Sequence, residues 1–151
     1  VIAVLLSIGA AGALLTLVNR TLVRVTGPPF TTGGSVPTAL EEGNASIFLL
    51  TATNHLNRSA YASWFFLFTA PNLTCEWFQV QVRLAIAPGG WTLLNCVQGG
   101  VAYPGGGGVE YANYSLPFPQ GYGPLQTEAN LFSIEPLVTG SFELTWGLTV
   151  G

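Results

Sequence analysis

The first eighteen residues constrain this chain more than any other feature. Residues 1–18 carry no charged side chain and are rich in Ala, Leu and Gly. An apolar run of this length predicts a helix, and eighteen helical residues extend roughly 27 Å, close to the hydrocarbon thickness of a bilayer. Since such a helix is apolar on every side, lipid or other helices must surround it. The chain starts without Met, so we expect that a leader is removed and the apolar run retained.

One face of the predicted helix carries small residues that let a second helix approach closely. Gly9 and Ala13 lie four residues apart, and Gly12 adjoins them. Random Ala and Gly content is the alternative explanation of this spacing. The residues expected to pack in a bundle of such helices are Val4, Ile8, Gly9, Gly12, Ala13 and Leu15.

Beyond the helix, the pattern predicts strands. Residues 19–26 either extend the helix or begin a strand, because Val and Thr favour strands. Apolar residues occupy every second position in 75–86 and in 141–150, as expected for strands with one buried face. Four further strands are expected, at residues 47–53, 63–69, 109–116 and 91–97, the last as the hairpin partner of 75–86.

These patterns predict an α+β fold class. We expect a hydrophobic N-terminal α-helix over residues 1–26 and an all-β, immunoglobulin-like sandwich domain over residues 46–151. Residues 27–45, which begin with Gly-Pro-Pro, are expected to form a linker or a first loop.

The scarcity of charge limits the choice of partners. Only 7% of residues are charged, against roughly 25% in an ordinary soluble protein. Four arginines in a chain of net charge −3 cannot build the basic surface that a phosphate backbone requires, so we exclude nucleic acid as a partner. A surface this poor in charge is either buried in an assembly or kept soluble by added groups.

Five Asn-x-Ser/Thr sequons suggest such a group. They predict N-linked glycans, the only covalent addition that we expect, on the exposed loops of an exported protein. Unused sequons in a Thr-rich chain are the alternative. The candidate acceptors are Asn19, Asn44, Asn57, Asn72 and Asn113.

The two cysteines fit export as well. Cys75 and Cys96 lie twenty-one positions apart, and in an exported protein an even cysteine count indicates a disulfide, with two buried free thiols as the alternative. Two cysteines and a single histidine, His55, do not complete a tetrahedral zinc site. We therefore expect no metal and no cofactor.

No catalytic constellation is visible in the sequence. The chain has no Asp and no Lys, so nucleophilic catalysis would have to combine His55 with a glutamate. His55 adjoins the sequon at Asn57, which favours a solvated loop. We expect from this that the chain is not an enzyme.

An uncharged helix at the mature N-terminus, followed by a Thr- and aromatic-rich β domain, resembles the archaeal type IV pilins. Residues 1–18 carry the resemblance, and Leu5 stands where bacterial pilins usually have Glu. The resemblance implies that a peptidase cuts before Val1 and that the helix first holds the subunit in the membrane. The helix then joins the core of a filament whose outer wall is the glycosylated domain.

The function implied is that of a subunit of an extracellular helical filament on the cell surface. Its partners would be identical subunits and the host or abiotic surfaces to which the filament adheres. Three alternatives remain open at this stage. One is an exported enzyme, whose activity would have to depend on His55 or a glutamate. The other two are non-catalytic. Residues 21–26 could pass as a strand between subunits, or the apolar segment could anchor a single surface glycoprotein in the membrane.

Overall fold

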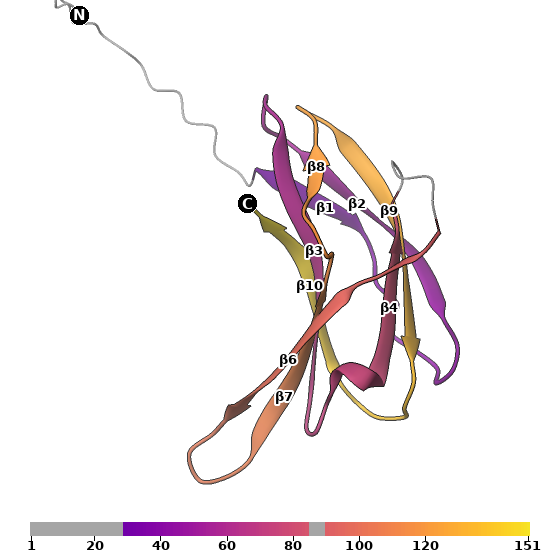
Figure 1. Ribbon diagram of the computed structural model, residues 1–151, viewed down its shortest axis with the longest axis vertical. Coiled ribbons are helices and arrows are strands. Elements are labelled where there is room, and N and C mark those ends of the chain that lie inside the picture. The colour runs from indigo at the N-terminus through magenta and orange to yellow at the C-terminus, as the bar shows by residue number, and fades with distance from the viewer. Residues whose placement is uncertain (1–28, 85–89) are drawn as a thin grey trace, which may run out of the picture.

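The computed structural model describes residues 29–84 and 90–151, which form a β-sandwich of two antiparallel sheets (Figure 1). The first sheet has the strand order β1 (Phe30–Gly34), β2 (Ser46–Asn54), β9 (Thr127–Pro136), β4 (Phe78–Arg83) and β5 (Thr92–Leu93). The second has the order β10 (Glu143–Val150), β3 (Ala60–Ala70), β7 (Gly108–Ser115) and β6 (Asn95–Ala102), and β8 (Gln120–Tyr122) also pairs with β3.

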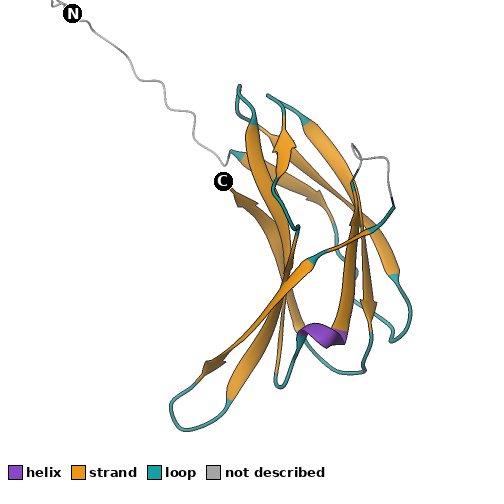
Figure 2. Ribbon diagram, in the orientation of Figure 1, coloured by secondary structure: helices purple, strands orange, loops and turns teal. Residues whose placement is uncertain are grey.

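The predicted α+β class is wrong. The described residues contain no α-helix, and their one helical element is the 3-10 turn η1 (Cys75–Trp77), as Figure 2 shows. The prediction relied on a helix over residues 1–26, which lie outside the described residues. The described sequence instead alternates with period two and is rich in aromatic and β-branched residues, a pattern that suits strands. No helix in the described part of the chain is long and apolar enough to cross a membrane.

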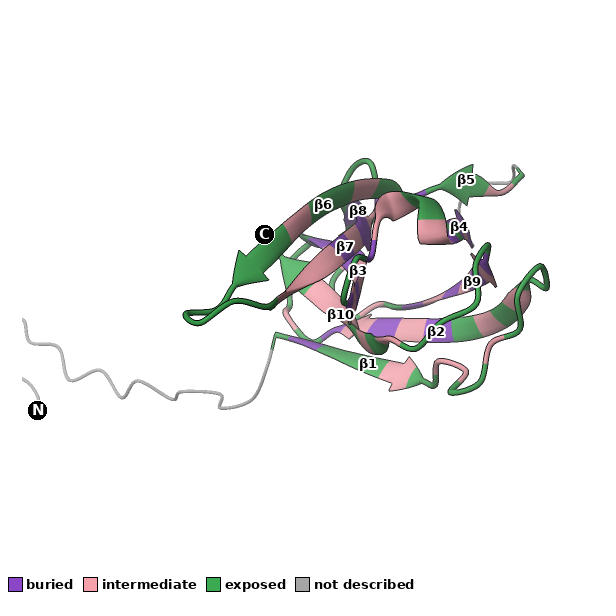
Figure 3. Ribbon diagram, turned by 90° about the horizontal axis from the view of Figure 1, so that it is seen from below, coloured by how far each residue is buried: buried purple, intermediate pink, exposed green. Residues whose placement is uncertain are grey.

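The hydrophobic core lies between the two sheets (Figure 3). Every second residue of β3 is buried, and this inner row includes Trp64, Phe66 and Phe68. Phe68 stacks on Phe78 of β4 with ring centroids 4.0 Å apart, and Phe66 meets Phe132 of β9 edge to face at 5.1 Å. Aromatic side chains bury large apolar areas, so these contacts between the sheets stabilise the sandwich.

The hairpin expected between residues 75–86 and 91–97 is shorter than the sequence indicated. β5 pairs with β4 through only two residue pairs, Gln81 with Leu93 and Val82 with Thr92. The chain then leaves the first sheet, and from Asn95 it runs as β6 beside β7 in the second sheet. The chain therefore changes sheets within a few residues after β5.

The hairpin of β6 and β7 projects beyond the sandwich (Figure 1). Its tip contains Gly105, Gly106 and Gly107, all with φ near +90°. Residues other than glycine seldom adopt this backbone conformation, so the run of four glycines allows the chain to make the turn of the hairpin. The tip also carries Tyr103, which is exposed.

Candidate functional site

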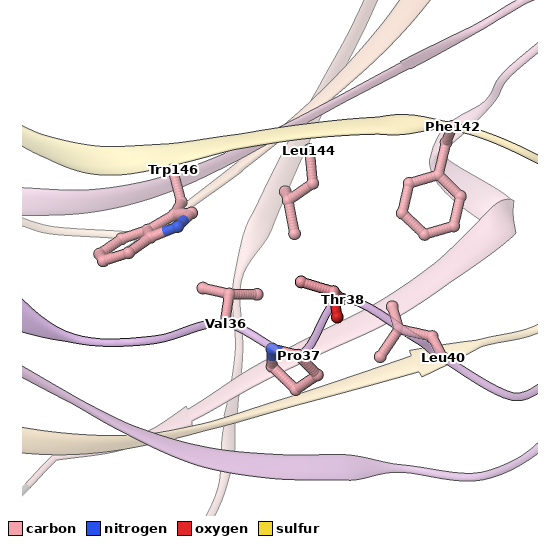
Figure 4. Close-up of a pocket in the computed structure, with 7 residues that line it drawn as sticks. All are labelled: Val36, Pro37, Thr38, Leu40, Phe142, Leu144 and Trp146. Atoms are coloured by element: carbon pink, nitrogen blue, oxygen red, sulfur yellow. The ribbon is translucent and has the colours of Figure 1, made fainter.

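One candidate binding surface of the domain is a groove beside the edge strand β10. Phe142, Leu144, Trp146 and Leu148 are directed toward the core but remain only partly buried, because β10 is the last strand of its sheet. Opposite them, the segment between β1 and β2 contributes Val36, Thr38 and Leu40, as Figure 4 shows. The hollow between these two walls has a volume of about 270 Å³ and contains no charged side chain.

A second hollow continues along β10 toward the C-terminus. It lies between β1 and the last residues of β10, is lined by Phe30, Thr32, Leu148 and Val150 among others, and has a volume of about 480 Å³. Its lining is also free of charge, and Pro29, the first described residue, belongs to it. We call the two hollows together the β10 groove. The described part of the chain therefore begins at one end of this groove.

The outer faces of both sheets also expose apolar side chains. On the first sheet, Ile47 and Leu49 of β2 are 60% and 50% exposed. On the second sheet, Tyr61 of β3 and Val97 of β6 are 59% and 61% exposed. Scattered apolar residues are normal on a protein surface, so these faces alone assign no partner.

The cysteines form a disulfide that joins the two sheets. Cys75 lies in η1, directly before β4 of the first sheet, and Cys96 lies in β6 of the second, with their Cα atoms 6.0 Å apart. Hydrogen bonds also hold the backbone of Cys75 next to the disulfide. The Tyr114 hydroxyl donates to the Cys75 carbonyl at 2.7 Å, and the Cys75 amide donates to Oε1 of Gln98 at 3.0 Å.

The predicted glycan acceptors lie in different environments. Asn44, Asn57 and Asn72 are exposed in loops and turns. Asn113 lies instead within β7, between Leu67 of β3 and Val97 of β6, and its Oδ1 is buried. Asn19 lies outside the described residues, as do all the residues predicted to pack in a helical bundle. The glycans themselves stay a prediction.

A buried polar cluster lies on the inner faces of β9 and β8, and the sequence analysis did not single it out. Glu128 is only 6% exposed, and its two carboxylate oxygens accept hydrogen bonds from the side-chain amides of Gln120 and Gln126, both at 2.7 Å. Burial raises the pKa of Glu128, and the hydrogen bond from Gln120 opposes this shift. Asn130 and Tyr122 donate to Oε1 of Gln120 at 3.1 and 3.0 Å.

Asn54 fixes the loops at the same end of the sandwich. Its side-chain amide donates to the carbonyls of Arg58 and Gly123, both at 2.9 Å, and its Oδ1 accepts from the amide of Leu56 at 2.9 Å. Neither Asn54 nor Glu128 borders any of the hollows described above. These contacts explain how buried polar groups are satisfied and how the loops are positioned.

His55 does not meet a glutamate in the contacts that the structure gives it. Its Nε2 lies 2.7 Å from Oγ1 of Thr31 in β1, and both side chains are exposed. A hydroxyl beside an imidazole is the pairing that nucleophilic catalysis uses, but such sites usually include a third group that orients the imidazole. The described residues also contain no cluster of three or more His, Cys, Asp or Glu residues able to hold a metal ion.

Comparison with known proteins finds a similar fold but no family. No protein-family model matches the sequence, and no curated protein does. The chain is similar to a solved structure titled "AvmM Catalyzes Macrocyclization in Alchivemycin A Biosynthesis". The two share 12% sequence identity at a TM-score of 0.52, over 81% of this chain and 88% of the other. At this identity, the similarity concerns the fold alone.

The expectation that the chain is not an enzyme is withdrawn. That expectation was drawn from missing motifs, yet a protein that catalyses macrocyclization has a similar fold. A sequence motif reveals only those catalytic arrangements whose residues have a fixed spacing along the chain. A β-sandwich can also bring together residues that are distant in the sequence. Thr31 and His55 are such a pair, since they meet although 24 positions separate them.

Proposed function

We propose that this chain is a structural subunit of an extracellular filament that polymerises through its N-terminal segment and mediates adhesion. The observation that carries the proposal is the position of the β10 groove. An uncharged groove begins at Pro29, the first described residue, and the uncharged residues 1–18 precede Pro29 in the sequence. One copy thus has an apolar segment for the filament core and, separately, an uncharged groove for a neighbour, and two different surfaces of this kind suit a head-to-tail contact.

The disulfide and the low charge support an extracellular location. Disulfides persist in oxidising environments outside the cytosol, and Cys75 and Cys96 are bridged here. The resemblance of residues 1–18 to archaeal type IV pilins supports the same proposal, with a membrane-inserted precursor and a filament core of packed helices. Burying about 1,000 Å² of apolar surface per subunit would contribute roughly 25 kcal/mol before ordering costs.

The test is electron microscopy of material sheared from the native cell surface, with mass spectrometry to identify this chain in it. Uniform thin fibres containing the chain are the expected result. A reconstruction with N-terminal helices at the axis would support the pilin-like arrangement, and strands passed between subunits without such an axial bundle would support the strand-exchange alternative. If the chain is found only as a detergent-soluble monomer, the filament proposal fails in favour of a membrane-anchored surface glycoprotein.

A further inference from the structure

We propose that the β10 groove receives residues 21–26 of a second copy as an added strand. This inference rests on the proposed filament and names the contact that links one subunit to the next. It concerns the segment between the apolar run and the domain, so it leaves residues 1–18 free for the filament core or the membrane.

The backbone of β10 is able to pair with such a strand. β10 pairs with β3 along one edge through eight residue pairs, from Glu143 with Thr69 to Val150 with Ala62. Within residues 29–84 and 90–151, no strand pairs with its other edge. An edge strand with free N–H and C=O groups is a ready template for pairing with another chain.

The side chains of β10 leave space for the occupant. The row of Leu144, Trp146 and Leu148 is only partly buried, whereas the equivalent row of the neighbouring β3, with Trp64, Phe66 and Phe68, is completely buried. The hollows of about 270 and 480 Å³ lie directly against the β10 row. Alternate side chains of an added strand would enter them and complete the burial.

Residues 21–26 have the chemistry that this groove accepts. Their sequence, Thr-Leu-Val-Arg-Val-Thr, places Thr21, Val23 and Val25 on one face of an extended chain. These small, uncharged side chains match a lining without charge. Arg24 falls on the opposite face and can remain in solvent.

The position of the segment favours a second copy over the same chain. Only residues 27 and 28 separate it from Pro29, which lies at one end of the groove. To fill its own groove, the chain would have to reverse within Gly27-Pro28-Pro29. A proline disfavours the helical conformation of the residue before it, so that residue is usually extended. Gly27 and Pro28 both precede a proline. The sequence Gly27-Pro28-Pro29 therefore disfavours the reversal that filling its own groove would need, and we assign the segment to the groove of a neighbour.

The test is disulfide trapping in filaments of the full-length chain. In a double variant, Val23→Cys and Leu144→Cys place one thiol on the donor face and one in the groove. A second double variant uses Leu148→Cys in place of Leu144→Cys, which covers a different register of the added strand. We expect at least one of them to give a ladder of covalent oligomers on a non-reducing gel after mild oxidation.

The matched control combines Val23→Cys with Thr145→Cys. Thr145 lies on the same strand between Leu144 and Trp146, but it is exposed on the opposite face of the sheet. We expect no ladder from this control. A ladder from the control as well would mean non-specific contact and would overturn the inference. So would an intrachain bridge, which keeps the product monomeric, or the absence of a bridge in both test variants.

Electron microscopy of the same samples separates the two proposals. Filaments without trapping at Leu144 or Leu148 would leave the filament function in place and refute the groove as the linking site. If the wild-type chain forms no filaments, the proposed function fails, and the inference that rests on it fails too. Thermal unfolding of each variant verifies that the domain is intact.

Discussion

Removing the disulfide between Cys75 and Cys96 should lower the free energy of unfolding by about 3 kcal/mol. The bridge closes a loop with a sequence separation of 21, and the chain-entropy model assigns about 3 kcal/mol at 25 °C to a loop of that length. The perturbation is the double variant Cys75→Ala/Cys96→Ala. The native geometry should persist, because the Tyr114 hydroxyl and the Gln98 side chain hold the backbone of Cys75 independently of the bridge.

The assay is urea unfolding followed by Trp fluorescence. Two observables should change together. The free energy of unfolding should fall by about 3 kcal/mol, and the m-value should rise because the unfolded chain without a crosslink exposes more surface. In thermal unfolding, the same loss corresponds to a drop in Tm of roughly 10 °C for a domain of this size. Chemical reduction of the wild-type protein is the control, and it should reproduce the shift without any substitution.

A loss below about 1 kcal/mol would refute the reasoning, because the constraint on the unfolded chain would then be offset elsewhere. An unchanged m-value combined with a large loss would refute it in a different way. The bridge would then act by holding the two sheets together in the folded state, and Cys75 would move once it is removed.

Three further substitutions test the buried polar groups, and mass spectrometry tests the glycans. Asn54→Ala removes one donor to the carbonyls of Arg58 and Gly123 and the acceptor of the Leu56 amide, so a loss of about 3 kcal/mol in the free energy of unfolding is expected in urea. Because burial raises the pKa of Glu128 above its ordinary value of 4.5, the wild type loses stability as pH rises past that value. The free energy of unfolding of Glu128→Gln, relative to that of the wild type, should therefore increase between pH 4 and pH 8. The same difference between the two proteins at both pH values would contradict this. Burial raises the pKa of Tyr114 from 10.0 to about 12, so its contribution is present below pH 10 and lost as pH approaches 12. Over that pH range, the free energy of unfolding of Tyr114→Phe should decline less steeply than that of the wild type. Glycopeptide mapping should find Asn113 unoccupied, because its place between two strands hinders access, and a glycan there would contradict this.

How far the sequence predicts the fold depends on the side chains that face the core. β3, β4 and β10 were expected from alternation or apolar runs, and strands occupy these segments, although β4 is shorter than predicted. β9 was missed even though it is central, because its inward positions include Glu128 and Asn130, which hide the alternation. These residues are buried only because neighbouring amides satisfy them, and residue types alone do not reveal that pairing.

β1 was missed for a different reason. The expected linker or first loop over residues 27–45 includes residues 30–34, yet these residues pair with β2 in register from Phe30 to Gly34. At Gly33 and Gly34 an added Cβ would collide with Thr51 and with the backbone of Leu49. The glycines therefore allow the strand to approach β2 closely, and a pair of glycines is not a residue pattern that predicts a strand.

The candidate site was the least predictable part. Cys75 and Cys96 were paired from their number and the expected export, and the structure contains that bridge. The β10 groove combines residues from 29–40 and 142–150, so no local pattern announces it. Its signal in the sequence is indirect, since the strand at 141–150 carries five apolar residues in alternation but nothing indicates that it lies at the edge of a sheet.

In the proposed fibre, the connection of the domain at Phe30 would also determine how a subunit bears tension. A pull transmitted through the N-terminal segment acts first on β1, an edge strand held to β2 by only five residue pairs. The crosslink between Cys75 and Cys96 keeps 21 residues from extending, which shortens the unravelled chain by roughly 70 Å. Under a load that opens the sandwich, each subunit would therefore yield at β1 first and still retain a closed loop that limits how far the fibre can stretch.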